Sequence, residues 1–107
     1  MPVQVSSHLY KSPIIRRLRE ALPTIHSHHG VKRIGIFGSF VRGEQTRKSD
    51  VDVLVEFLPG EETFQNFIQL ADFLETIFKR NVDLLTEPSL SDLLRPYIEK
   101  DVIWVEG

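Results

Sequence analysis

The sequence predicts a small α/β (α+β) domain in which helices pack on a mixed β-sheet. Segments with apolar residues at helical spacing alternate with short runs of valine, isoleucine and leucine along the 107 residues. One run, VDVLVEF at 51–57, is apolar apart from its acidic residues, which is typical of a central strand covered on both faces. The length favours a single domain. We assign that domain to residues 12–107 and expect residues 1–11 to form a loose N-terminal arm.

The first expected element is an amphipathic helix that begins after Ser12 and ends near Gly30. Ser12 suits the N-cap, Pro13 the first helical position and Gly30 the C-terminal cap. Pro23 is expected to kink this helix or to restart it. The apolar residues that recur at helical spacing are Ile14, Ile15, Leu18, Leu22 and Ile25. The next segment, VKRIGIFG at 31–38, reads as a strand that ends in glycine.

A short helix and a second strand are expected in the middle of the chain. The short helix begins at Ser39 and ends near Gly43, and the polar segment EQTRKS forms a loop after it. DVDVLVEFL at 50–58 is the second strand, and Pro59 and Gly60 end it.

The second long helix is expected from Glu61 to about Arg80, followed by a third strand, NVDLLTE, at 81–87. Phe73 falls off the main apolar face of this helix and is a candidate for a partner surface. The residues expected in the buried stripe are Phe64, Phe67, Ile68, Ala71, Leu74, Ile77 and Phe78.

The C-terminal part is expected to contain a short helix at 90–100, interrupted or restarted at Pro96, and a last strand at 102–106. Tyr97 and Trp104 fit either the edge of the core or an interface, and we favour the core.

Three of the four histidines lie in IHSHHG at 25–30, where the first helix ends. His26 and His29 could share a helix face, so a metal site is one interpretation. A polar, fraying helix end is the favoured one, because no carboxylate lies close in sequence.

The composition excludes several classes of protein. The chain has no cysteine, so it has no disulfide framework and no thiolate nucleophile or metal ligand. Its first residues, MPVQVSSHLYKSP, lack the charged start and apolar core of a signal peptide, and no apolar run approaches the length of a membrane span. We therefore expect a cytoplasmic protein without a membrane association.

The charges are unevenly distributed, although the net charge is only −2. Residues 1–48 carry nine Lys or Arg against two Glu, whereas residues 49–107 carry four Lys or Arg against thirteen Asp or Glu. This pattern fits two differently solvated faces, or a basic side for phosphates beside an acidic side for a metal ion. Arginines on the outside of the first helix are best read as a solvated face, so direct nucleic-acid binding is not expected.

Two aspartates open the otherwise apolar second strand. Asp50 and Asp52 are two residues apart, so in a strand their side chains point to the same face. Two carboxylates held this close repel each other unless a cation lies between them. Oxygen ligands favour Mg²⁺ or Mn²⁺, and Mg²⁺ usually completes its coordination with water and substrate phosphates. The pair therefore predicts a metal site that serves a phosphate-bearing ligand.

Asp83 is a third acid inside an apolar strand. If the strands at 50–58 and 81–87 are neighbours, Asp83 can flank the first two aspartates. Three carboxylates are enough to bracket two metal ions, one at the phosphates and one at an attacking hydroxyl.

Gly38 and Ser39 could supply the phosphate-binding half of the site. Glycine lets the backbone approach a phosphate closely, and the serine adds a hydroxyl. Arg42 lies one helical turn further on and can face the same site, and Lys48 or Arg47 could reach a terminal phosphate. Each of these features alone is common in ordinary turns and loops, but their combination favours a functional site over a structural one.

The segment from Gly38 to Asp52 resembles the motif of the DNA polymerase beta superfamily of nucleotidyltransferases, specifically its minimal nucleotidyltransferase (MNT) branch. The motif is Gly-Ser, ten residues and Asp-x-Asp, and here it reads Gly38-Ser39, FVRGEQTRKS, Asp50-Val51-Asp52. The specific part of the resemblance covers residues 35–57 and the strand around Asp83.

The resemblance implies a nucleotidyltransferase fold and the transfer of a nucleoside monophosphate, AMP from ATP in our reading, to a hydroxyl group. Asp50 and Asp52 would bind both of two Mg²⁺ or Mn²⁺ ions, and Asp83 would bind the catalytic ion and help to deprotonate the acceptor. Gly38 and Ser39 would hold the β- and γ-phosphates.

The resemblance also implies a partner, because larger relatives carry additional domains for the acceptor. MNT proteins of this size resemble antitoxins that can adenylylate a tyrosine of a HEPN-domain RNase toxin. A homo- or hetero-oligomer is compatible with this resemblance. Two alternatives stay open: an antitoxin that neutralises its partner by contact alone, and a small-molecule or RNA nucleotidyltransferase whose acceptor site comes from a partner.

Overall fold

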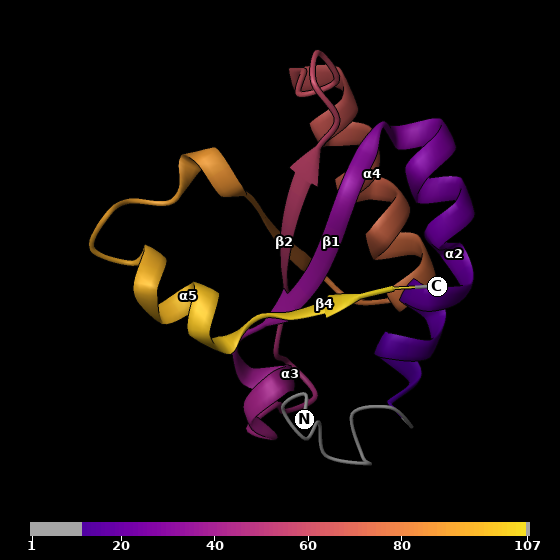
Figure 1. Ribbon diagram of the computed structural model, residues 1–107. Helices are drawn as coiled ribbons and strands as arrows, with labels where there is room; N and C mark the ends of the chain where they lie inside the picture. The colour runs from indigo at the N-terminus through magenta and orange to yellow at the C-terminus, as the bar shows by residue number, and fades with distance from the viewer. Residues whose placement is uncertain (1–11, 107) are drawn as a thin grey trace.

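The structure, a computed structural model, describes residues 12–106, and the expected N-terminal arm at 1–11 lies outside the described residues. Helices and strands alternate in the expected order, which confirms the α/β class (Figure 1). The elements are α2 (Pro13–His29), β1 (Val31–Phe37), α3 (Ser39–Arg42), β2 (Val51–Phe57), α4 (Phe64–Phe78), β3 (Val82–Thr86), the 3₁₀ turn η1 (Glu87–Ser89), α5 (Arg95–Asp101) and β4 (Ile103–Val105).

The four strands form one mixed sheet in the order β3-β2-β1-β4. β1 pairs antiparallel with β2 and with β4, and β2 pairs parallel with β3. The parallel pair is connected through α4, because parallel neighbours need a crossover rather than a tight turn. β2 therefore lies inside the sheet, as its apolar sequence predicts.

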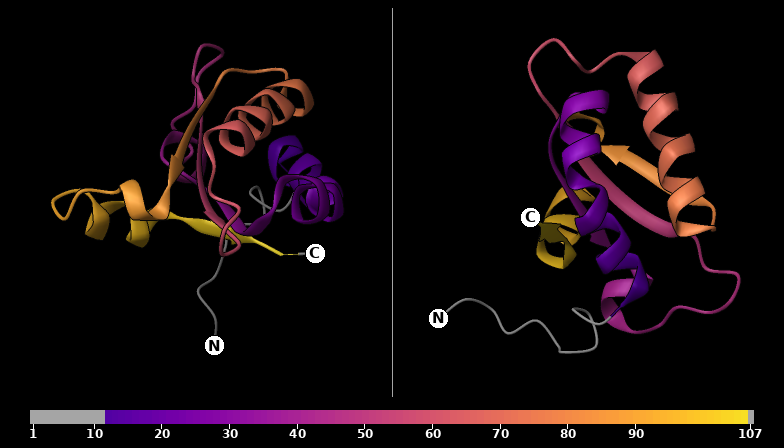
Figure 2. Two further views of the ribbon diagram at one scale, coloured as in Figure 1. Left: turned by 90° about the horizontal axis from the view of Figure 1, so that it is seen from above. Right: turned by 90° about the vertical axis from the view of Figure 1, so that its right-hand side faces the viewer.

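The two long helices cover one face of the sheet, and the segment from η1 to α5 lies on the other (Figure 2). Alternation along β2 directs Val51, Val53 and Val55 into the main core with α2 and α4. Leu54 points to the opposite face, where it forms a smaller cluster with Phe37 and Leu90. Asp52 lies on this second face, because it is two residues from Leu54.

The helix α2 begins and ends as expected. The Ser12 hydroxyl accepts a hydrogen bond from the Ile14 N–H at 3.2 Å, and Gly30 takes a left-handed conformation with φ of 65° after the last turn. The predicted restart at Pro23 is wrong, since the helix continues through it to His29. Burial of apolar residues on both sides of Pro23 holds the two halves in one helix.

The buried face of α4 differs from the predicted stripe. The helix begins at Phe64 rather than Glu61, because the Thr63 hydroxyl caps it by accepting from Asn66 N–H at 3.1 Å. Phe64 is 81% exposed and Ile68 is 41% exposed, whereas Leu70, which the stripe omits, is fully buried. α4 packs against both α2 and β3, and this double contact turns its buried face toward Leu70.

Phe73 is not a free partner surface, because it packs against the main core. Its ring lies 4.9 Å from the ring of His29, centroid to centroid. The histidine segment is likewise an ordered helix end and does not fray: Nδ1 of His26 lies 2.8 Å from the carbonyl oxygen of Val31.

The expected helix at 90–100 forms only from Arg95, and Pro96 lies in its first turn instead of interrupting it. Tyr97 is 71% exposed, so the expectation of a core position is wrong for it. Trp104 is half-buried in the smaller cluster, and the Arg33 guanidinium lies over its ring at 3.9 Å. Tyr97 thus lies on α5, whereas Trp104 lies on the edge strand β4.

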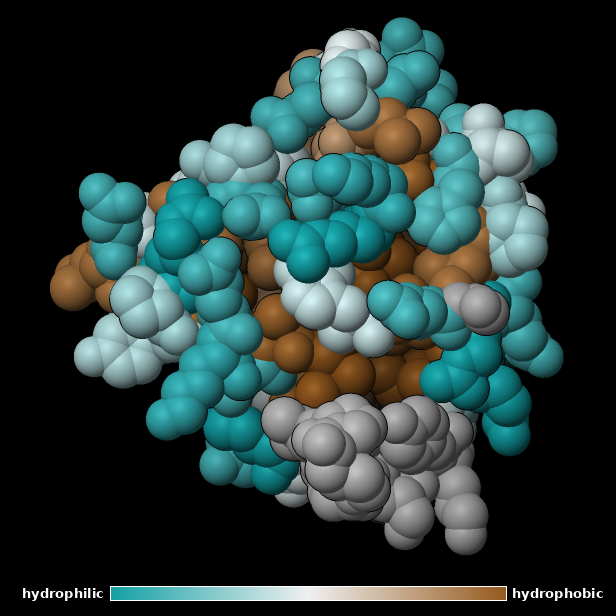
Figure 3. Space-filling view, in the orientation of Figure 1, coloured by the Kyte–Doolittle hydropathy of each residue, from teal (hydrophilic) through white to brown (hydrophobic). Residues whose placement is uncertain are grey.

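Apolar side chains gather around the edge strand β4 on the face shown in Figure 3, between groups of polar ones. None of the helices between residues 12 and 106 combines the length and the apolar character needed to cross a membrane.

Lys79 ends α4 in a left-handed conformation, with φ of 55°, and among the described residues it is the one non-glycine residue with positive φ. This conformation costs an L-residue on the order of 1 kcal/mol. We expect Lys79→Gly to raise the midpoint of thermal unfolding by about 4 °C. Lys79→Ala is the matched control, because it removes the same side chain and keeps the strain. Equal midpoints for the two variants would contradict this interpretation.

Candidate functional site

Three chain segments that carry the predicted site residues meet at one end of the sheet. Asp52 and Asp83 are direct partners in the parallel register of β2 and β3, so the neighbour relation expected from the sequence is confirmed. Asp52 also pairs with Phe37, the last residue of β1, and Gly38 follows immediately. Gly38, Asp52 and Asp83 are thus brought side by side, with Asp52 in the middle.

Gly38 makes the closest approach in the site. Its φ of 78° and ψ of −146° belong to a region that is essentially restricted to glycine. A Cβ atom at this position would lie 2.1 Å from Oδ2 of Asp52, so no other residue fits without displacing that carboxylate. Its carbonyl oxygen accepts from the N–H groups of Val41 and Arg42, which starts α3 directly after the turn. Gly38 therefore forms a cradle shaped around the Asp52 carboxylate.

Asp52 is half-buried and surrounded by negative charge. Burial and the nearby carboxylates of Asp83 and Asp50 raise the pKa of Asp52, and Arg42 lowers it by a smaller effect. Asp83 is the registered neighbour of Asp52 and Asp50 lies two residues before it, so the three residues lie at the same end of the sheet. A cluster of carboxylates without a cationic side chain at its centre has the charge and the oxygen donors that a divalent cation needs.

As they lie here, no three of the His, Cys, Asp and Glu side chains between residues 12 and 106 are arranged to hold a metal ion. The histidines of the α2 end form no such group either. Nδ1 of His29 is buried without a hydrogen-bond partner, and burial, with His28 beside it, lowers the pKa of His29.

Ser39 and Arg42 lie on α3, at the same end of the sheet. Ser39 is the first residue of the helix and is half-buried beside Gly38. Arg42 is exposed and already engaged, with Nε donating to Glu44 at 3.0 Å and a terminal nitrogen donating to Asp101. These hydrogen bonds raise the pKa of Arg42. Arg42 therefore connects α3 to α5 in addition to lowering the pKa of Asp52, a role that the sequence did not reveal.

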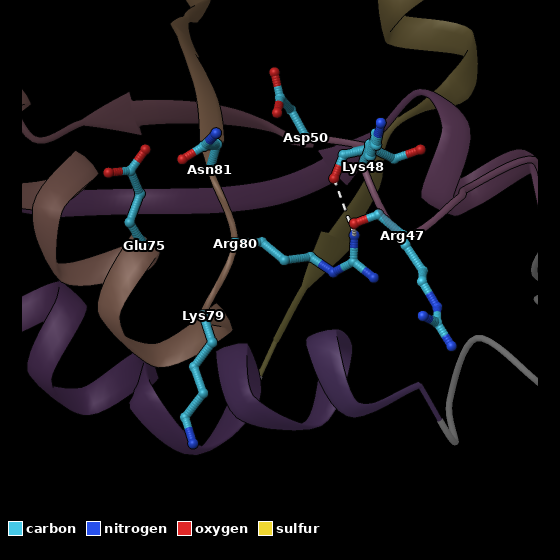
Figure 4. A pocket seen from close by; sticks show the side chains of 8 residues that line it. Arg47, Lys48, Asp50, Glu75, Lys79, Arg80 and Asn81 are labelled. Atoms are coloured by element: carbon cyan, nitrogen blue, oxygen red, sulfur yellow. Dashed lines mark hydrogen bonds between the residues drawn. The ribbon is translucent and has the colours of Figure 1, made fainter.

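Lys48 and Arg47 lie on the loop that leads to Asp50, and all three residues line a pocket of about 550 Å³ (Figure 4). The other side of this pocket is formed by the end of α4 and the start of β3, including Lys79 and Arg80. Neither Lys48 nor Arg47 forms an ion pair with another residue of the described part of the chain. Both cations are therefore available to an anionic ligand at the Asp50 end of the site.

Arg80 is a site residue that the sequence did not predict, and it contacts the loop that carries Arg47 and Lys48. Its guanidinium donates to three backbone carbonyl oxygens of the loop. No spacing rule signals such a contact, because the two segments are more than thirty residues apart in sequence.

The raised pKa of Asp52 predicts a gain of stability on neutralisation. As the pH rises between the ordinary pKa of an aspartate and the raised one, the unfolded chain releases this proton first, so native stability falls with rising pH. Each neighbouring carboxylate adds a repulsion on the order of 1 kcal/mol when water screens the pair. We expect Asp52→Asn to have the higher free energy of unfolding at neutral pH, and this difference should shrink as the pH falls.

Urea unfolding at several pH values measures this difference. Asp72→Asn is the control, since Asp72 is exposed on α4, which covers the opposite face of the sheet. An Asp52→Asn protein that is less stable than the wild type at neutral pH would contradict the assigned electrostatics.

The chain matches the nucleotidyltransferase domain family over residues 15–105. It is 38% identical over 96 residues to a chain from Methanocaldococcus jannaschii to which protein adenylyltransferase activity is assigned, covering 88% of this chain and 96% of that one. It is 39% identical over 83 residues to the protein adenylyltransferase MntA of Thermococcus cleftensis, covering 76% of this chain and 81% of the relative.

Solved structures share the fold. One assigned as a minimal nucleotidyltransferase superimposes with a TM-score of 0.73 at 34% identity, covering 92% of this chain and 98% of the other. A toxin–antitoxin structure with AMP-PNP gives a TM-score of 0.63 at 27% identity, covering 89% and 71%. A complex of MNT antitoxin with a tri-AMPylated HEPN toxin from Shewanella oneidensis gives a TM-score of 0.56 at 23% identity, covering 97% of this chain and 73% of the other. At this identity the likeness shows the fold alone.

Proposed function

The chain belongs to the nucleotidyltransferase domain family, and on this premise we propose that it transfers AMP from ATP to a hydroxyl group of a partner protein and acts as an antitoxin. It is a nucleotidyltransferase with relatives named protein adenylyltransferases. The observation that carries the proposal is the arrangement of Gly38, Asp52 and Asp83. Gly38, which no larger residue can replace, lies against the carboxylate of Asp52. Asp52 in turn is paired with Asp83 in the register of the neighbouring strand.

The transfer forms one bond and breaks one bond at the α-phosphorus. The acceptor hydroxyl oxygen attacks the α-phosphorus and loses its proton, and the bond from that phosphorus to the oxygen bridging to the β-phosphate breaks. Pyrophosphate leaves. Such reactions are accelerated mainly by positioning and by compensation of developing negative charge.

The site supplies carboxylate oxygens, the donors that a divalent cation prefers, because Asp83 is the registered neighbour of Asp52 and Asp50 precedes Asp52 by two residues, although these side chains are not yet arranged around a common point. We assign Asp50, Asp52 and Asp83 as the residues that would hold Mg²⁺, or Mn²⁺, with two ions in the complete site. When bound, these ions would neutralise phosphate charge and favour ionisation of the acceptor hydroxyl. Asp83 is exposed beside Asp52 and is our candidate acceptor for the hydroxyl proton.

Gly38 and Ser39 would hold the β- and γ-phosphates. Gly38 has no side chain to keep a phosphate away from the backbone, and the Ser39 hydroxyl forms no hydrogen bond with another described residue that would occupy it. Arg42 and Lys48 would add positive charge near the phosphates, Arg42 from α3 and Lys48 from the loop before Asp50.

The partner we propose is a HEPN-domain toxin, modified on a tyrosine, with both proteins in the cytoplasm. The support is the fold shared with MNT antitoxins that are described in complex with HEPN toxins. We further propose that residues 12–107 form one minimal nucleotidyltransferase domain, which the family match over 15–105 supports.

Differently labelled nucleotides test the reaction type. The purified protein is incubated with Mg²⁺, the HEPN-type protein encoded beside it, and ATP labelled at the α- or the γ-phosphate. We expect label on the partner from α-labelled ATP alone, because the γ-phosphate leaves with pyrophosphate. Transfer of the γ-label would identify a kinase and overturn the proposal.

A further inference from the structure

Arg80 contacts the loop that delivers Asp50 to the site. This loop, residues 44–49, connects α3 to β2 and is largely exposed. One terminal nitrogen of Arg80 lies 3.1 Å from the carbonyl oxygen of Thr46, 3.2 Å from that of Arg47 and 3.1 Å from that of Ser49. Figure 4 shows the guanidinium directed at the loop backbone, whereas the neighbouring Lys79 points away from it.

The same guanidinium also contacts α3, the helix that follows Gly38 and Ser39. Its central carbon lies 5.2 Å from the centre of the Phe40 ring, and Phe40 is buried in the main core. Arg80 lies between α4 and β3, and the carbonyl oxygen of the next residue, Asn81, accepts from Val51 N–H at 2.9 Å. One side chain thus joins the phosphate-binding turn, the loop before Asp50 and the strand that carries Asp83.

The loop has local structure of its own, and its first residue, Glu44, is bonded to α3, where its N–H donates to the carbonyl oxygen of Ser39 at 2.9 Å. Inside it, the Ser49 hydroxyl accepts from Thr46 N–H at 2.7 Å, and the Thr46 hydroxyl accepts from Lys48 N–H at 3.2 Å. These bonds keep a turn together and do not attach it to anything. Arg80 attaches residues 46–49 to the rest of the domain, and hydrogen bonds from a charged donor are stronger than those between neutral groups.

We infer that Arg80 is a positioning residue, which holds the 44–49 loop and thereby sets the place of the Asp50 carboxylate relative to Asp52 and Gly38. The inference rests on the proposed function, since the position of Asp50 matters for nucleotidyl transfer. A displacement of a catalytic group by about 1 Å can cost about 100-fold in rate, so loosening the loop should act mainly on turnover.

Three variants separate positioning from charge and from packing. Arg80→Met keeps the aliphatic stem near Phe40 and removes the three hydrogen bonds. Arg80→Lys keeps the charge and can restore part of the contact. Lys79→Asn is the matched control, because it removes a positive charge from the same pocket without touching the loop, and asparagine tolerates the left-handed conformation of this position.

Hydrogen–deuterium exchange measures the opening of the loop and does not depend on enzymatic activity. In Arg80→Met we expect exchange of the amides at 46–51 to rise at least about tenfold, with α2 and β1 as in the wild type. The exchange of these amides should be intermediate in Arg80→Lys, and in Lys79→Asn it should equal that of the wild type. Unchanged exchange in the loop of Arg80→Met would overturn the inference, and so would an equal rise throughout the domain, which would indicate a general loss of stability.

Steady-state kinetics completes the test. For AMP transfer we expect kcat to fall at least about tenfold in Arg80→Met while KM for ATP changes less than about threefold, with partial rescue in Arg80→Lys. Equal losses in Arg80→Met and Lys79→Asn would make this a charge effect and overturn the inference. If the wild type transfers nothing, the proposed function fails separately, and the amide exchange of the loop in Arg80→Met alone decides the positioning role.

Discussion

Asp52→Asn should abolish AMP transfer, with a loss of about 1,000-fold or more in kcat/KM. Asp52 is the central carboxylate of the site, against Gly38 on one side and Asp83 on the other. Asparagine keeps the size of the side chain and removes the negative charge that would hold a divalent cation. The same substitution should stabilise the fold, as argued from the raised pKa, so the loss of activity cannot be attributed to unfolding.

Two comparisons sharpen this prediction. Asp50→Asn should show a similar loss of transfer, because Asp50 and Asp52 act on the same cation in our account, whereas Asp72→Asn should transfer AMP as the wild type does. An Asp52→Asn protein that retains more than about a tenth of wild-type kcat/KM would show that the carboxylate cluster does not carry the reaction.

Gly38→Ala should destabilise the domain by about 3 kcal/mol and eliminate activity in the fraction that remains folded. Two costs add at this position. The backbone has φ of 78° and ψ of −146°, which strains any residue other than glycine. The new Cβ would also lie 2.1 Å from Oδ2 of Asp52, so the carboxylate must move away from its place beside Asp83.

Gly60→Ala is the matched control, because Gly60 also has positive φ, 82°, and a Cβ there would meet nothing within 4 Å. Gly60→Ala should be destabilised only by the backbone strain of its positive φ, and it should keep its activity. Asp52→Ala removes the atom that the Cβ would strike, so Gly38→Ala should cost less in that background. A Gly38→Ala protein as stable as Gly60→Ala would contradict the close contact on which the site is built.

The catalytic half of the site could be predicted from sequence because its residues break local rules. Asp52 and Asp83 are acids in strands that are otherwise apolar, and a glycine–serine pair ends the preceding strand. Such departures are expected at functional sites rather than in a core. Their proximity follows if the strands at 50–58 and 81–87 are neighbours, which the parallel register confirms.

The remaining features depend on tertiary contacts that have no local signal. Arg80 reads as an ordinary helix end, yet it binds a loop more than thirty residues away. Phe64 is exposed and Leu70 is buried, contrary to the predicted stripe, because α4 packs against α2 and β3 together. Helical spacing alone does not determine which face of a helix contacts two neighbours. Tyr97 is exposed because the segment that carries it covers only part of the second face.

The most direct measurement is tandem mass spectrometry of the HEPN-type partner after incubation with ATP and Mg²⁺, comparing wild-type protein with Asp52→Asn. We expect the wild type to add AMP to a tyrosine of the partner and to silence its RNase activity, and Asp52→Asn to do neither. A partner that is silenced equally by both proteins and carries no AMP would contradict the account, and would show instead an antitoxin that acts by binding alone.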